Sequence, residues 1–135
     1  MKLNGKEVVQ MSQHNPINLG KHGLVKLSIP SGWNMVINTF YYIKLSEMEK
    51  DNKLYITLSQ DLMYIEKKGR KVTLGIDVGW YPDMDPDGCY RILVIRNAEW
   101  EKPLEKYESR DIDDIIIKVE EFLEKYGETY NYVKN

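Results

Sequence analysis

Between residues 71 and 96, the segment KVTLGIDVGWYPDMDPDGCYRILVIR has the most regular pattern of hydrophobic and polar positions in the chain. From Val72 to Trp80 every second residue is hydrophobic, and the residues between them are small or polar. This alternation is typical of a β-strand with one buried and one bare face. The stretch from Cys89 to Ile95 is hydrophobic at nearly every position, as in a strand covered on both sides. The segment therefore predicts a β-hairpin.

The turn of this hairpin, Asp83 to Gly88, contains Pro86, which fixes φ, and a glycine that accepts positive φ. Its alternating aspartates also match the first half of a calcium-binding loop. The bidentate glutamate of such a loop is replaced by Val94, and no helix is expected on either side. A plain hairpin turn is therefore favoured, while cation binding stays open.

Hydrophobic and β-branched runs elsewhere predict further strands. They cover 33–43, 54–58 with 62–66, 104–108 and at most a short piece of 24–29. The alternation breaks near Ser59–Asp61, which indicates a bulge. The Gly-centred segment Lys67–Lys71 predicts a tight turn into the hairpin. Ser46 and Glu49 have the spacing of a capping box for one helical turn, and a plain turn is equally open.

After residue 110 the hydrophobic period changes from two to between three and four. The stripe runs from Ile112 to Tyr126, aspartates crowd its start and Gly127 follows it, so we expect an amphipathic helix that ends there. Residues 127–135 are expected to form a frayed tail, and 1–23 a loop-rich segment. The predicted fold is α+β, in one domain over 1–135: an antiparallel meander of about five or six strands with one C-terminal amphipathic helix packed on one face.

Composition narrows the class of protein. Of 135 residues, 42% are hydrophobic and 30% charged, as in ordinary globular domains. No apolar run reaches the roughly 18 residues of a membrane span, and residues 1–7 lack the apolar region of a secretory signal. The single cysteine, Cys89, suits a reducing compartment and an inert strand position. We therefore expect a cytoplasmic protein that does not bind membranes.

The charge is uneven along the chain. Residues 1–72 hold eleven Lys/Arg and six Asp/Glu, a balance of +5, whereas 73–135 hold eight and fifteen, a balance of −7. The acidic second half argues against nucleic-acid binding and leaves room for a basic partner. The basic segment Lys67–Lys71 is more typical of a soluble turn than of a phosphate contact.

No catalytic motif is found. The two histidines, His14 and His22, lie in presumed loops, and Cys89 has no base linked to it in sequence. We therefore expect no catalytic residue, metal ligand or cofactor. Ten tyrosines and three tryptophans exceed what a core of this size must hold. Several of them surround the acidic turn, and rings beside carboxylates suit a protein interface.

A series of motifs resembles the small immunity proteins of bacterial polymorphic toxin and contact-dependent inhibition systems. It comprises a strand-rich half, the Gly79–Gly88 hairpin, Trp100-Glu-Lys-Pro103, Ser109-Arg-Asp111 and the closing helix, and it covers roughly residues 33–126. The resemblance implies a protein that is not an enzyme and that covers the active site of a cognate toxin with acidic and aromatic residues. The basic segment Lys67–Lys71 departs from a uniformly acidic surface and weakens the case for a nuclease target.

The candidate partner-binding residues are Asp77, Tyr81, Asp83, Asp85, Asp87, Tyr90 and Trp100. Gly75 and Gly79 would let another backbone, from the C-terminal helix or a partner, approach the hairpin. An alternative is a small-ligand or enzymatic domain whose site beneath the 80–90 hairpin is lined by Arg91, Asp77 and Tyr90. Pairing of two copies through an edge strand is also open.

Overall fold

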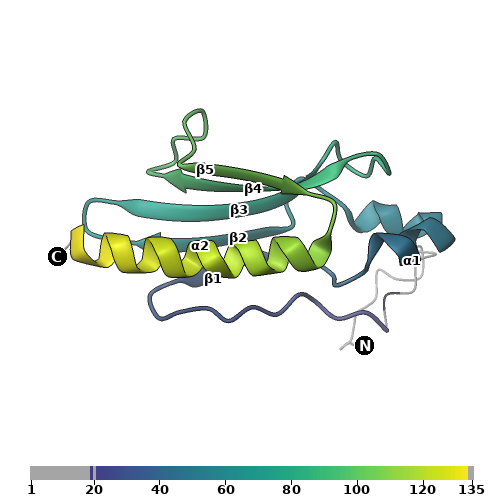
Figure 1. The fold of residues 1–135 in the computed structure, drawn as a ribbon, viewed down its shortest axis with the longest axis horizontal. Helices are drawn as coiled ribbons and strands as arrows, with labels where there is room; N and C mark the ends of the chain where they lie inside the picture. The colour runs from purple at the N-terminus through teal and green to yellow at the C-terminus, as the bar shows by residue number, and fades with distance from the viewer. Residues whose placement is uncertain (1–18, 20, 134–135) are drawn as a thin grey trace.

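The computed structural model describes residues 19 and 21–133, with side chains up to residue 127. Within them, five antiparallel strands form one sheet in sequence order, β1-β2-β3-β4-β5, with a long helix on one face (Figure 1). The elements are β1 Asn34–Asn38, α1 Leu45–Lys50, the 3₁₀ helix η2 Asn52–Thr57, β2 Met63–Lys68, β3 Thr73–Tyr81, β4 Cys89–Arg96, β5 Glu105–Ser109 and α2 Ile112–Val133. The predicted α+β meander with a packed C-terminal helix is confirmed.

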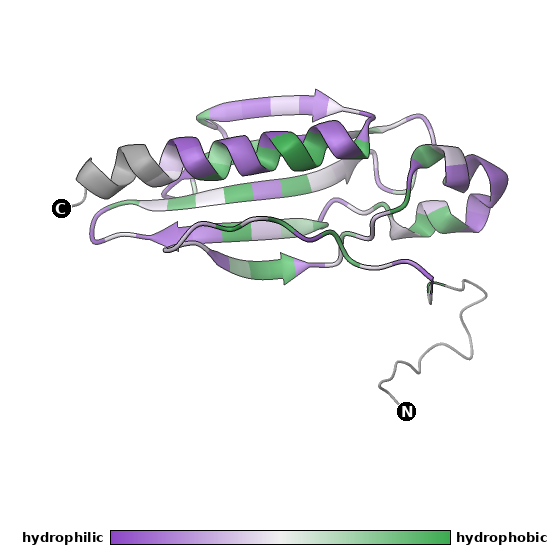
Figure 2. Cartoon of the chain, turned by 60° about the horizontal axis from the view of Figure 1, so that its bottom comes forward, coloured by the Kyte–Doolittle hydropathy of each residue, from purple (hydrophilic) through white to green (hydrophobic). Residues whose placement is uncertain are grey.

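The central hairpin is β3 and β4, as the alternation predicts. Their register runs from Leu74 opposite Arg96 to Tyr81 opposite Cys89, so β3 is the middle strand of the sheet. The hydrophobic residues of β3 face α2 and are buried: Leu74, Ile76, Val78 and Trp80. In Figure 2, hydrophobic and polar residues follow one another in bands along the strands and along α2.

Helix α2 lies across β3, β4 and β5 and buries Ile115, Val119 and Leu123, which recur every fourth residue. The helix extends to Val133, so the predicted end at Gly127 and the predicted frayed tail are wrong over the described residues. Gly127 is used for close packing instead, because a Cβ there would lie 3.1 Å from the indole nitrogen of Trp33. Residues 134 and 135 lie outside the described residues.

The β2–β3 turn is less basic at its surface than its sequence suggests. Lys67 is buried in β2, and its ammonium donates to the carbonyl of Gly127 at 3.2 Å, which ties the sheet to α2. The tight turn itself is confirmed, with the N–H of Gly69 bonded to the carbonyl of Val72 at 2.8 Å. Only Lys68, Arg70 and Lys71 of the predicted cluster are exposed.

The first predicted strand is shorter than its hydrophobic run. β1 ends at Asn38, whose side chain accepts from the N–H of Phe40 and donates to the carbonyl of Val25, so the chain turns away from the sheet. The register also slips between Met35 and Ile37. Within 24–29 only an isolated bridge forms, between Leu24 and Tyr41.

The strand predicted over 54–58 is wrong, because this segment is the 3₁₀ helix η2. Asp51 caps it by accepting from the N–H of Lys53, and its buried residues, Leu54 and Tyr55, are adjacent rather than alternate. A helical turn does form as α1, but Lys44 is its N-cap and makes no side-chain cap bond, so the capping box of Ser46 is not present. Most of the predicted loop-rich segment 1–23, including His14, lies outside the described residues.

Candidate functional site: the sheet face opposite the helix

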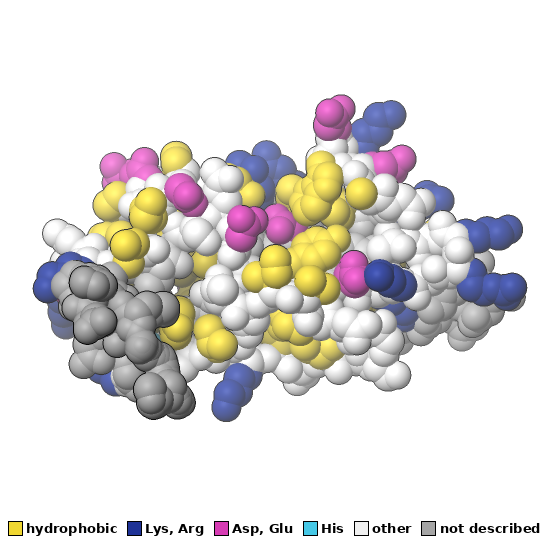
Figure 3. Space-filling view, turned by 180° about the vertical axis from the view of Figure 1, so that it is seen from behind, with side chains coloured by type: hydrophobic (Ala, Val, Ile, Leu, Met, Phe, Trp, Pro, Cys, Tyr) yellow, Lys and Arg dark blue, Asp and Glu magenta, His cyan; other side chains and the backbone are white. Residues whose placement is uncertain are grey.

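The sheet face that α2 does not cover, here called the far face, has one row of side chains that crosses all five strands. Strand pairing places Ile37 opposite Tyr64, Tyr64 opposite Asp77, Asp77 opposite Leu93 and Leu93 opposite Lys106. Figure 3 views the molecule from this side and shows hydrophobic side chains gathered in its middle, with acidic side chains among them. Basic side chains gather at the end that the β2–β3 turn forms.

The loop between β4 and β5 places Trp100 over the far face. Asn97 anchors the loop to β3, because its N–H and its side-chain oxygen pair with the backbone of Thr73 at 2.7 and 2.8 Å. Asn97 and Ala98 both have left-handed backbones, with φ of 53° and 59°, which alanine rarely adopts. The indole of Trp100 lies 6.1 Å from the Tyr64 ring and stays 48% exposed. We name Ile37, Tyr64 and Trp100 the hydrophobic strip.

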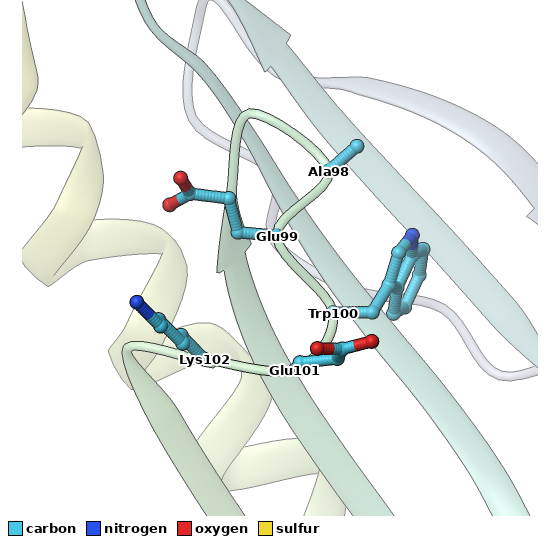
Figure 4. Close-up of a pocket in the computed structure, with 5 residues that line it drawn as sticks. All are labelled: Ala98, Glu99, Trp100, Glu101 and Lys102. Atoms are coloured by element: carbon cyan, nitrogen blue, oxygen red, sulfur yellow. The ribbon is translucent and has the colours of Figure 1, made fainter.

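The same loop encloses a shallow hollow of about 290 Å³. Its lining is Ala98, Glu99, Trp100, Glu101 and Lys102. In Figure 4 the side chains of Trp100 and Glu101 point to the same side of the loop, whereas Glu99 and Lys102 point to the other. A carboxylate therefore accompanies the exposed indole on the far face.

The polar side of β3 was expected to be bare, and that expectation is wrong. Gly75, Asp77 and Gly79 are all buried. A Cβ on Gly75 would lie 2.2 Å from the hydroxyl of Tyr64, and one on Gly79 would lie 2.1 Å from the carbonyl oxygen of Gln60. Close approach of another backbone is thus confirmed at Gly79, where it comes from the 59–61 loop, but Gly75 is covered by the Tyr64 side chain, and α2 approaches neither glycine.

Asp77 lies on β3 between these two glycines and is only 9% exposed. Within the described residues no hydrogen bond to its carboxylate is formed. Its burial, and then the charge of Asp61, raise the pKa of Asp77 from the ordinary 3.8 to about 6, against the opposing effect of Arg91. Arg91 is engaged elsewhere, because its Nε bonds Glu108 at 3.2 Å and its guanidinium stacks 4.0 Å from the Tyr81 ring.

The acidic turn, Asp83 to Gly88, uses two of its three aspartates for its own structure. Asp83 accepts from the N–H of Gln60 at 2.7 Å, and Asp85 accepts from the N–H of Asp87 at 2.8 Å. Asp87 is exposed. Among the described residues no group of three or more His, Cys, Asp or Glu is placed to hold a metal ion.

Two further contacts hold the acidic turn. Arg110 donates to the carbonyls of Gly88 and Pro86, and the indole nitrogen of Trp80 donates to the carbonyl of Asp85 at 2.8 Å. The left-handed residue of the turn is Met84, with φ of 57°, and not Gly88. Gly88 is instead required by space, since a Cβ there would lie 2.5 Å from the carbonyl oxygen of Tyr81.

Tyr90 does not belong to this site. It is 0% exposed and packs in the core, with its ring 4.8 Å from that of Trp80 and 5.5 Å from that of Phe40. Asp77 and Arg91 point to the far face, whereas Tyr90 points toward α2, so these three residues do not line one pocket. The pocket expected beneath the hairpin is filled by these packed rings.

Of the predicted contact residues, Asp77, Tyr81 and Trp100 therefore lie on the far face, and the acidic turn adjoins them through the bond between Asp83 and Gln60. Sequence reasoning missed Tyr64, Ile37 and Asp61. The alternation within β2 marks Tyr64 as opposite in direction to Ile65, but only the strand register shows that it faces Asp77.

No helix in the described part of the chain has both the length and the apolar character needed to cross a bilayer. In comparisons with protein-family models, curated proteins and solved structures, nothing matched this chain.

Proposed function

We propose that this chain is a protein-binding module without catalytic activity, of the immunity type, that neutralises a cognate bacterial toxin domain through its far face and acidic turn. The observation that carries the proposal is the hydrophobic strip, in which Ile37 on β1 and Trp100 in the β4–β5 loop remain exposed. Aromatic residues surrounded by polar groups are typical of the central contacts of protein interfaces.

The charges around the strip favour a basic partner. Two cations of the far face are already paired, Lys68 with Glu66 at 3.6 Å and Arg91 with Glu108 at 3.2 Å. Asp61, Asp87 and Glu101 are exposed and make no ion pair within the described residues. Such carboxylates would speed association with a basic surface and discriminate against acidic ones.

The binding elements are also held in place before any partner arrives. The fork of Arg110 and the indole of Trp80 hold the acidic turn, and Asn97 anchors the loop that presents Trp100. Preorganised groups lose less conformational entropy on binding, which favours affinity.

Co-expression tests this function directly. Each gene next to the one that encodes this chain is expressed in bacteria with and without it, and growth and complex formation on size exclusion are measured. We expect one neighbouring product to be toxic alone, harmless with this chain and recovered as a stable complex. Toxicity that persists in every pair, with no complex formed, would refute the proposal.

A further inference from the structure

We propose that Asp77, with Asp61 beside it, forms a binding site for one arginine side chain of the protein partner. This inference rests on the proposed function and adds the chemical group that the far face recognises. The site consists of Asp77 and Asp61 with the rings of Tyr64 and Tyr81.

The first argument is the burial of a carboxylate without a counter-ion. Asp77 is nine-tenths buried, and no donor within the described residues bonds to it. Buried charges in proteins are normally paired or hydrogen-bonded, because desolvation is otherwise costly. The nearby cation, Arg91, is held by Glu108 and Tyr81. No group in the described part of the chain thus satisfies the Asp77 carboxylate, whose remaining exposed surface is open to solvent or to a donor from a partner.

The second argument concerns the shape of that donor. Tyr64 stands directly opposite Asp77 on β2, and Tyr81 lies four residues further along β3 on the same face. A planar guanidinium can bond a carboxylate with its edge and stack on aromatic rings with its face, whereas an ammonium is a compact, strongly hydrated charge. Arg91 already stacks on Tyr81 in this manner, 4.0 Å from the ring centroid. An arginine fits this site better than a lysine.

The glycines on both sides of Asp77 support the same conclusion. Gly75 lets the Tyr64 ring lie close against β3, and Gly79 lets the Gln60 carbonyl do the same. Side chains at these two positions would push both covering groups outward. The Asp77 carboxylate therefore lies between the Tyr64 ring and the Gln60 carbonyl, which shield it from solvent. A guanidinium that binds there would lose water, and its attraction to the carboxylate would be stronger than in bulk solvent.

The raised pKa of Asp77 is consistent with a site that lacks its cation. An arginine at 3 Å would lower this pKa again, so binding at acidic pH must first remove a proton. Arginine affinity is therefore expected to be constant above about pH 7 and to fall below pH 6. The charged groups that act on Asp77 are Asp61 from the 59–61 loop and Arg91 from β4, and Tyr64 and Tyr81 stay neutral in this range.

A nuclear magnetic resonance titration with acetyl-arginine amide tests the site without knowledge of the partner. At pH 7.5 and constant ionic strength, amide shifts of the wild type, Asp77→Asn and Asp87→Asn are followed. Acetyl-citrulline amide serves as the neutral isostere. Asp87→Asn is the matched control, because it removes the same charge from the exposed acidic turn.

We expect saturable shifts around residues 61, 64, 77 and 81, with a dissociation constant on the order of 10 mM. They should persist in Asp87→Asn and vanish in Asp77→Asn and with citrulline. Shifts that follow the acidic turn instead, or that survive Asp77→Asn, would overturn the site. A carboxyl pKa of Asp77 below 4 in the free protein would also overturn it, because Arg91 would then already neutralise the carboxylate.

Partner binding separates this inference from the proposed function. If a neutralised partner is found, Asp77→Asn should weaken the complex by about tenfold or more, and the control Glu124→Gln, which removes an exposed charge from α2, by less than about threefold. Equal, small losses would refute the arginine site while the proposed function stands. Arginine binding at Asp77 in a protein that rescues no toxicity would refute the function and leave the site.

Discussion

Asp77 is only 9% exposed, and its carboxylate accepts no hydrogen bond from the described residues. Burial of an ionised group without a partner lowers the stability of a protein. A group whose pKa is raised on folding binds its proton more tightly in the folded state. The folded protein therefore loses stability as the pH rises from about 4 through 6, and that loss remains at higher pH. Groups that reduce stability in this way are concentrated at binding sites.

Asp77→Asn should accordingly stabilise the protein. Above pH 7 we expect the free energy of unfolding to rise by about 1–2 kcal/mol, after allowance for the solvent that still reaches the site. At pH 4 the difference should nearly vanish, because the native carboxyl is protonated there. Urea unfolding at both pH values measures this, with Asp87→Asn as the control. A stabilisation that is the same at pH 4 and pH 8 would contradict the electrostatic cause.

Gly79→Ala should be strongly destabilising. Its Cβ would lie 2.1 Å from the carbonyl oxygen of Gln60, and this backbone atom cannot swing aside. We expect a loss of about 2–3 kcal/mol, as for other overpacked sites. Gly23→Ala is the matched control, since nothing lies within 4 Å of its added Cβ. Chemical denaturation of the two variants measures the difference, and equal stability would show that the 59–61 loop moves freely.

The direction of single side chains could be predicted only where the sequence alternates. In β3 the pattern fixes which residues face the core, so Asp77 and Tyr81 are correctly placed together on the other side. In β4 nearly every residue is hydrophobic, and its two charged residues, Arg91 and Arg96, point to opposite faces, so the sequence has no alternation that places Tyr90 in the core. The choice follows only from the pairing with β3, a contact between residues distant in sequence.

At the scale of elements, long periodic segments were predictable and short hydrophobic ones were not. The β3–β4 hairpin and α2 each have a clear period over many residues. Residues 54–58 are too short a segment to distinguish a strand from a 3₁₀ helix, and the cap from Asp51 lies outside that segment. The end of α2 was missed because Gly127 was interpreted as a terminator, whereas it lies inside the helix, close to the indole of Trp33.

The acidic turn depends on an element that lies outside the hairpin. Arg110, just before α2, donates to the carbonyls of Gly88 and Pro86 and lies 5.6 Å from the Trp80 ring. The planar fork of arginine can serve both carbonyls, which an ammonium cannot do with the same geometry. Arg110 thus links the start of α2 to the acidic turn, which adjoins the far face.

Arg110→Lys should loosen this turn without unfolding the sheet. We expect a loss of about 1 kcal/mol and a roughly fivefold faster hydrogen exchange of the Gly88 amide, which bonds to the carbonyl of Asp85. Arg96→Lys, at the exposed end of β4, is the control. Hydrogen exchange measured by nuclear magnetic resonance distinguishes the two. Unchanged protection of Gly88 in Arg110→Lys would show that Trp80 holds the turn alone.

At the scale of the whole molecule, the two faces of the sheet have different roles. α2 closes one face and supplies the core, with Ile115 and Leu123 fully buried. The far face is only partly covered, by the Tyr64 ring, the Trp100 loop and the 59–61 loop. Its ends differ in charge, with the acidic turn at one and Lys68, Arg70 and Lys71 at the other. A basic partner would therefore be oriented as well as attracted.

Two exposed isoleucines, one on the far face and one on α2, allow one experiment to test which side of the molecule binds the partner. Ile37 lies in the hydrophobic strip and is 41% exposed, whereas Ile117 lies on the outer side of α2 and is 56% exposed. Alanine at either position removes the same atoms from a largely solvated site, so both variants should lose less than about 1 kcal/mol of stability.

If the far face binds the toxin domain, Ile37→Ala should weaken the complex by about 1–2 kcal/mol, because its side chain becomes buried there. Ile117→Ala should bind like the wild type. Isothermal titration calorimetry with the partner found by co-expression gives both affinities, and growth rescue gives the cellular counterpart. Weaker binding by Ile117→Ala together with normal binding by Ile37→Ala would move the interface to the helix side and leave the hydrophobic strip without a role in recognition.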